Sequence, residues 1–139
     1  MLDAFFKPNA VAIIGASQSP GKLGYTVLAN VIESGFKGNI YPINPNASQI
    51  YNVKAYPSVM ELPEVPDLAV IVIPYNHVPA AMRECGEKGI KAVVVISAGF
   101  REASVEGMER ELEVIEIAKK YGIRVIGPNC LGIIDTYTP

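Results

Sequence analysis

The stretch that decides the fold is "VAIIGASQSPGKLGYTVLANV", from Val11 to Val31. It begins with a short β-branched apolar run, passes through a turn rich in glycine, serine and proline, and continues at helical spacing. A strand that leads through such a turn into a helix is an arrangement that binds phosphate groups, because free backbone N–H groups at the helix start point at the ligand. The stretch therefore predicts the first strand and helix of an α/β domain, with an anion site between them.

Further apolar runs follow this stretch, and they read as strands. Their hydrophobicity is continuous rather than alternating, which is typical of parallel strands that are covered on both faces. The second run is the weakest, and it contains Pro42. The predicted strands are 10–15, 39–44, 68–74, 91–97 and 123–128.

Three segments at helical spacing lie between the strands, at 24–35, 77–89 and 104–122. We expect Ser104 to cap the third helix. Its predicted buried stripe consists of Val105, Met108, Leu112, Ile115 and Ala118.

The alternation of strands and helices predicts one domain over residues 1–139. Its expected fold is a Rossmann-like, doubly wound parallel sheet of about five strands with helices on both faces. Right-handed crossovers favour the strand order 3-2-1-4-5, numbered along the chain. In such a sheet the ligand lies beyond the carboxyl ends of the strands.

Composition excludes several classes of function. Half of the 139 residues are apolar, 19% are charged and the net charge is −2, so no basic field is available for nucleic acid or an anionic membrane. No apolar run approaches the roughly 18–20 residues of a membrane span, and no signal peptide is evident. Two cysteines and one histidine predict a cytoplasmic protein with no metal in the domain.

The glycine-rich turn matches neither of the two common phosphate loops. Five residues rather than four separate Gly15 from Gly21, and Leu23 stands where a Walker A motif has Ser or Thr. The dinucleotide pattern fails as well, because Ser17 replaces its second glycine. The end of the second strand, "NPN" at 44–46, offers neither the carboxylate that holds the ribose of NAD nor an arginine for NADP.

Several linked motifs resemble the coenzyme A-binding domain of the NDP-forming acyl-CoA synthetases. They are "VAIIGASQSPGKLGYTVLANVIESGFKGNIYPINP", "VKAYPSVMELPEVPDLAVIVIP", "CGEKGIKAVVVISAGF" and "YGIRVIGPNCLGI". The resemblance covers essentially the whole chain. It is strongest to the α subunits of ADP-forming acetyl-CoA synthetases and extends, more distantly, to those of succinyl-CoA synthetases.

The resemblance implies a CoA site at the strand ends. The phosphates would meet the loop after the first strand, while Asn44 and Pro45 would border the adenine and ribose. Ile73 and Pro74 would flank the adenine or the pantetheine arm, and the last two strand exits would line the path of that arm. The implied binding residues are Gly15, Ala16, Ser17, Gln18, Lys22, Gly24, Asn44, Pro45, Ile73, Pro74, Ser97, Ala98, Gly99, Asn129 and Cys130.

In this family a histidine of a second α/β domain carries a phosphoryl group, and an ATP-grasp domain supplies the nucleotide. Neither domain is in this sequence, so the resemblance implies the N-terminal part of a longer synthetase subunit, with those domains as partners and no catalytic residue of its own. The alternatives are a stand-alone CoA-binding protein and an NAD(H)-sensing regulatory module. Homo-oligomerisation stays open.

Two residues tempt a catalytic interpretation. His77 stands at the exit of the third strand, away from the family's phosphohistidine position, and we expect a surface or packing role. Cys130 has no evident base partner, which favours lining of the site or burial over direct nucleophilic attack.

Overall fold

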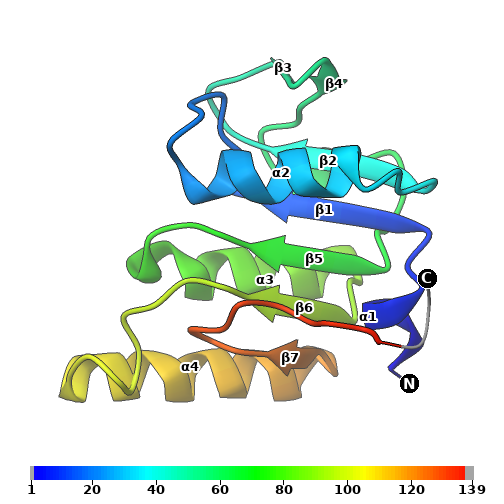
Figure 1. The fold of residues 1–139 in the computed structure, drawn as a ribbon. Coiled ribbons are helices and arrows are strands. Elements are labelled where there is room, and N and C mark those ends of the chain that lie inside the picture. Colours follow the sequence, from blue (N-terminus) through cyan, green and yellow to red (C-terminus); the bar gives the residue numbers. More distant parts are fainter. Residues whose placement is uncertain (1, 137–139) are drawn as a thin grey trace.

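A computed structural model describes residues 2–136 of the chain, in which strands and helices alternate (Figure 1). None of the helices in this range has both the length and the hydropathy that a membrane crossing requires. The elements are α1 (Asp3–Phe6), β1 (Ala10–Ile14), α2 (Leu23–Glu33), β2 (Asn39–Ile43), β3 (Gln49–Ile50), β4 (Val53–Lys54), the 3-10 helix η1 (Val59–Glu61), β5 (Leu68–Ile71), the 3-10 helix η2 (Tyr75–His77), α3 (Val78–Lys88), β6 (Ala92–Val95), α4 (Val105–Tyr121) and β7 (Arg124–Ile126).

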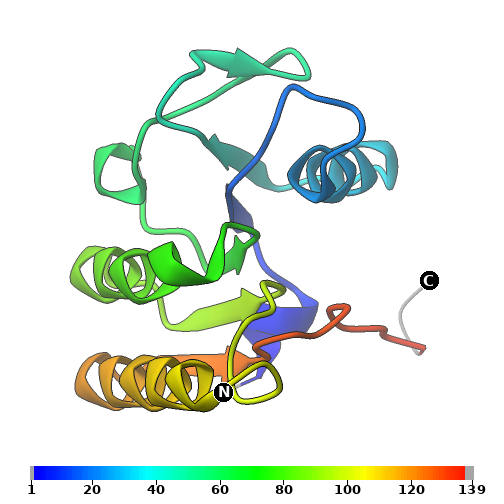
Figure 2. The same ribbon diagram turned by 90° about the vertical axis from the view of Figure 1, so that its left-hand side faces the viewer.

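The main sheet of the described residues has the order β2-β1-β5-β6-β7, and every neighbouring pair is parallel. All residues of β1 are buried, as expected for a strand that has covered faces on both sides. Figure 2 shows α2 on one side of the sheet and α3 with α4 on the other. The predicted doubly wound parallel α/β sheet is confirmed.

The predicted strand order is wrong. When the main-sheet strands are numbered along the chain, the order is 2-1-3-4-5 rather than 3-2-1-4-5, because β5 pairs with β1 and leaves β2 at the edge. Pro42 of β2 is compatible with an edge position, since proline has no N–H to donate to a second neighbouring strand. The order therefore reverses between β1 and β5, and the ligand crevice is expected there.

The connection from β2 to β5 accounts for this reversal. It carries no helix on the α2 side of the sheet. Instead, Val59 of η1 and the following Leu62 pack in the same apolar cluster as Met82 of α3. A right-handed crossover on the face opposite α2 returns the chain across β1, so that β5 is added on its far side.

Helix α4 buries a different face from the predicted one. It packs through Val114, Ile117 and Ala118, of which only Ala118 belongs to the predicted stripe. The other four residues of that stripe are exposed: Val105, Met108, Leu112 and Ile115. Both sets recur at helical spacing, so the pattern alone identifies an apolar face without saying which one meets the sheet.

The predicted helix boundaries are confirmed where capping residues set them. The Ser104 side chain accepts a hydrogen bond of 2.9 Å from the Gly107 N–H at the start of α4. Gly89 and Gly122 end α3 and α4 in the left-handed conformation, with φ of 97° and 66°. Glycine reaches this region without the strain that a Cβ would add.

Substitutions of Met82 in α3 and Met108 in α4 test which helix faces are buried. Met82 is 0% exposed and Met108 is 39% exposed. We expect Met82→Ala to lower the free energy of unfolding by about 2–5 kcal/mol, because it leaves a core cavity. Met108→Ala should change it by less than about 0.5 kcal/mol. Urea denaturation followed by circular dichroism measures both, and equal losses would contradict the packing described above.

Candidate functional site

A cavity of about 820 Å³ opens at the carboxyl ends of β1, β2 and β5, at the point where the strand order reverses. The loops after these strands line it, together with the start of α2 and one side of α3. Most of the predicted binding residues meet here: Gly15, Ala16, Ser17, Lys22, Gly24, Asn44, Pro45, Ile73, Pro74 and Ser97.

Two glycines bring the loop after β1 against its neighbours. Gly15 has a φ of 98°, and a Cβ at this position would lie 2.1 Å from the carbonyl oxygen of Val72. A Cβ on Gly24 would lie 1.9 Å from the carbonyl oxygen of Gly15. Neither position accepts a side chain unless the backbone moves. The start of α2 is therefore held directly against the loop, and both border the cavity.

The first turn of α2 is open to an anion. Its N-cap residue, Lys22, makes no side-chain capping bond, and no acidic residue occupies the turn. The first N–H groups of a helix have no carbonyl partner within it, and they form the positive end of the helix dipole. The Lys22 side chain adds a full charge at the same place. This end of the cavity therefore favours phosphate or another compact anion.

Asn44 and Ser97 tie the strand exits together. The Asn44 side chain donates 2.9 Å to the carbonyl oxygen of Ala16 and accepts 2.7 Å from the N–H of Asn46. The Ser97 hydroxyl accepts 3.1 Å from the N–H of Ile73 and donates 2.5 Å to its carbonyl oxygen. Because these polar atoms already bond to the protein, both side chains hold the shape of the cavity.

The remaining predicted residues lie outside the lining: Gln18, Ala98, Gly99, Asn129 and Cys130. The Gln18 amide donates 3.0 Å to the carbonyl oxygen of Gln49. The Asn129 N–H donates a hydrogen bond of 2.9 Å to the Ser97 carbonyl oxygen, and the Cys130 thiol donates one of 3.3 Å to the Val95 carbonyl oxygen. The segment after β7 is thus bonded to β6 and its exit.

The turn after β6 is closed by a carboxylate of its own. Glu102 accepts 2.6 Å from the Gly99 N–H and 3.1 Å from the Phe100 N–H. These backbone hydrogen bonds, first that from Phe100 and then that from Gly99, lower the pKa of Glu102. The Arg110 guanidinium donates to the Gly99 carbonyl oxygen and lies 4.2 Å over the ring of Tyr75. This turn is therefore fixed beside the exit of β5.

Sequence reasoning missed one wall of the cavity. It is formed by Pro57 and by one side of the segment that leads into α3, with His77, Ala80, Ala81 and Glu84. His77 is exposed, as expected, but it also lines the cavity. The spacing of 77, 80, 81 and 84 places these residues on one helix face, and that spacing is the signal in the sequence that could have found them.

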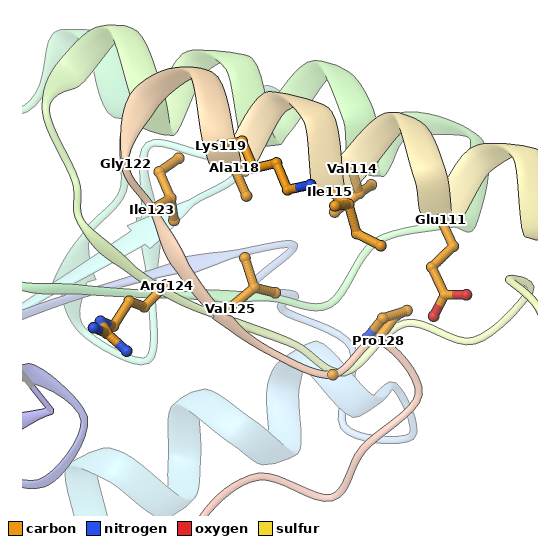
Figure 3. A pocket seen from close by; sticks show the side chains of 11 residues that line it. Glu111, Val114, Ile115, Ala118, Lys119, Gly122, Ile123, Arg124, Val125 and Pro128 are labelled. Carbon is orange, nitrogen blue, oxygen red and sulfur yellow. The ribbon is translucent and has the colours of Figure 1, made fainter.

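A second cavity lies at the other edge of the sheet. It measures about 460 Å³ and runs between α4 and β7, where Val114, Ile115 and Val125 border it, with Glu111 and Pro128 close by (Figure 3). None of the predicted binding residues lines it. Within residues 2–136, no three His, Cys, Asp or Glu side chains are grouped to hold a metal ion. The cavity at the ends of β1, β2 and β5 is the candidate functional site.

Comparison with known proteins adds independent information. Residues 9–136 match the family described as "CoA binding domain". The chain is 52% identical over 137 residues to the α subunit of ADP-forming acetate–CoA ligase II of Pyrococcus furiosus, and the match covers 99% of this chain and 30% of that subunit. An ADP-forming 4-hydroxybutyrate–CoA ligase of Nitrosopumilus maritimus is 48% identical, over 92% of this chain and 18% of the ligase.

A solved structure agrees with these matches. The apo form of a dinucleotide-forming acetyl-coenzyme A synthetase 1 from Ca. Korarchaeum cryptofilum has a TM-score of 0.90 and 43% identity, over 95% of this chain and 28% of the solved chain. The chain thus spans less than a third of each of these relatives. Since the family match alone extends over residues 9–136, the chain belongs to the family of CoA-binding domains.

Proposed function

We propose that the chain binds coenzyme A in the cavity at the ends of β1, β2 and β5, as the CoA-binding domain of an ADP-forming acyl-CoA synthetase. The observation that carries the proposal is the uncapped start of α2, with Lys22 beside it, at the strand-order reversal of a CoA-binding domain. CoA carries a diphosphate and a 3′-phosphate. The loop of Gly15–Ser17 and the first turn of α2 would receive phosphate through backbone N–H groups.

The exit of β2 supports CoA over NAD. The residues there, Asn44, Pro45 and Asn46, are neutral and border the cavity. A carboxylate at this position is what holds the ribose hydroxyls in NAD-binding domains. The same carboxylate would repel the 3′-phosphate that CoA carries on its ribose. A neutral exit is therefore compatible with CoA and removes the usual anchor for NAD.

The pantetheine arm would leave the phosphates along the exits of the next strands. Ile73, Pro74 and Ser97 line the cavity on that side. The turns at 98–99 and 129–130 lie beyond them, and the Asn129 N–H is bonded to the Ser97 carbonyl oxygen. In this proposal the two turns guide the arm towards the place where acyl transfer occurs in the complete enzyme, and Gln18 stays at the rim of the phosphate end.

The complete enzyme would form acyl-CoA, ADP and phosphate from an acid, ATP and CoA. In the proposal this domain holds CoA, while a phosphohistidine domain and an ATP-grasp domain act as its partners. The small share of each relative that the chain covers supports further domains or subunits. One of these relatives is named for acetate and the other for 4-hydroxybutyrate, which supports a role for this domain that does not depend on the acid.

Calorimetry with CoA, dephospho-CoA and NAD in parallel tests the proposal directly. We expect CoA to bind more tightly than NAD, and we expect dephospho-CoA to lose affinity because it lacks the 3′-phosphate. Binding of NAD without any CoA signal would overturn the proposed function.

Lys22 is expected to stabilise bound phosphate. Lys22→Ala should weaken CoA binding by about 1–3 kcal/mol, because it removes a charge-assisted contact. The affinity of the variant should also depend less on salt than that of the unmodified chain. Lys37→Ala is the matched control, since this exposed lysine lies outside the cavity. Isothermal titration in low and high salt measures both, and an unchanged affinity of Lys22→Ala would exclude it from the site.

Gly24 and Gly21 form a matched pair at the start of α2. Gly24→Ala places a methyl group against the Gly15 carbonyl oxygen, whereas nothing lies within 4 Å of a Cβ on Gly21. We expect Gly24→Ala to lower stability by about 1–3 kcal/mol through overpacking and to weaken CoA binding. Gly21→Ala should leave both unchanged. Thermal unfolding and calorimetry of the two variants provide the test, and wild-type affinity in Gly24→Ala would show that this contact does not shape the site.

A further inference from the structure

The cavity has two chemically different ends. Lys22 and the start of α2 make one end positive. Glu84 lies seven residues after His77 along α3, which corresponds to about 10 Å from the exit of β5 at the helical rise per residue. It is the acidic residue of the lining. A bound molecule with both phosphate and neutral parts therefore has one favourable direction, with its phosphates towards Lys22 and away from Glu84.

A hydrogen bond from a neighbouring side chain holds the Glu84 carboxylate in place. Its Oε1 accepts a hydrogen bond of 3.2 Å from the Ser58 hydroxyl. Ser58 is itself positioned, because the same hydroxyl accepts 3.1 Å from the Met60 N–H at the start of η1. A carboxylate accepts hydrogen bonds at both oxygens. Oε2 can thus receive a donor from a ligand while Oε1 stays anchored.

The surroundings of Glu84 suit a flat apolar ring. Pro57 lines the cavity on one side, and Ala80 and Ala81 line it along α3, one turn before Glu84. Proline and alanine offer apolar surface with no side-chain hydrogen-bonding group, so they can pack against an aromatic ring. Pro45 and Pro74 extend this apolar lining towards the strand exits.

We propose that Glu84 is the residue that recognises the base: adenine packs against Pro57, Ala80 and Ala81, and its exocyclic amino group donates to Oε2 of Glu84. This inference rests on the proposed binding of CoA. An amino group is a donor and matches a carboxylate, whereas a purine without this group offers Oε2 no donor at that position. Glu84 therefore selects adenine and fixes the direction in which CoA lies.

The test compares adenosine 3′,5′-bisphosphate with purine riboside 3′,5′-bisphosphate, which differs from it only by lacking the exocyclic amino group. Calorimetry on the 139-residue chain should show at least about tenfold tighter binding of the adenosine compound, as expected for a hydrogen bond to a charged group. In Glu84→Ala the two affinities should become equal. Glu87→Ala, an exposed carboxylate of the same helix outside the cavity, should keep the wild-type ratio.

The ratio of the two affinities is unaffected by any general loss of folded protein, because both compounds are measured on the same variant. A wild-type chain without preference, or a Glu84→Ala variant that keeps the preference, would overturn the assignment. It would also be overturned if Glu84→Ala weakened CoA binding but left the bisphosphates unaffected, because Glu84 would then face the pantetheine arm. If neither CoA nor the adenosine bisphosphate binds the wild-type chain, the proposed function itself fails.

Discussion

The approach of Gly24 to the carbonyl oxygen of Gly15 is the constraint on which the candidate site depends. It holds the start of α2 at the exit of β1, the strand that is paired on both sides at the reversal of the sheet order. The exits of β2 and β5 are bonded to the exit of β1. The Gly15 N–H donates a hydrogen bond of 3.1 Å to the Ile43 carbonyl oxygen, and the Val72 N–H donates one of 2.8 Å to the Ile14 carbonyl oxygen. The first residues of α2, Leu23 and Gly24, therefore line the cavity.

Polar side chains at the strand exits contribute mainly by holding this arrangement. Asn44 connects the exit of β2 to the loop after β1, and Ser97 connects the exit of β6 to that of β5. Glu102 closes the next turn through two backbone N–H groups. A cavity whose walls are already bonded to one another loses little conformational freedom when a ligand enters, which lowers the cost of binding. A ligand in this cavity would meet the start of α2, Lys22, Glu84 and a largely apolar wall.

The candidate site was only partly predictable from the sequence, because some of its parts have a local sequence signal and others do not. The loop of 15–24 and the neutral exit of β2 could be recognised because glycine, proline and charge have local meanings that hold in any fold. The spacing of Ala80, Ala81 and Glu84 places them on one helix face, but it does not show that this face lines a cavity rather than meeting solvent. Conversely, Asn129 and Cys130 stood out by residue type and place in the sequence, yet their atoms bond to β6 and its exit.

By itself, the sequence determined the doubly wound parallel fold, the helix caps and the glycine-rich loop after β1 on which the proposed phosphate site rests. These follow from local properties: continuous apolar runs, glycine and serine at helix ends, and free N–H groups where a helix begins. Only the tertiary structure decided which neighbour β5 takes and which of the two apolar faces of α4 is buried. Pro42 is compatible with the edge position of β2, but the predicted order placed this strand between two others, and the observed order depends on Val59 and Leu62 packing on the α3 side. Both strand orders, and both faces of α4, satisfy the local sequence pattern equally well. They differ in the apolar surface that they remove from water, and packing between distant segments therefore decides between them.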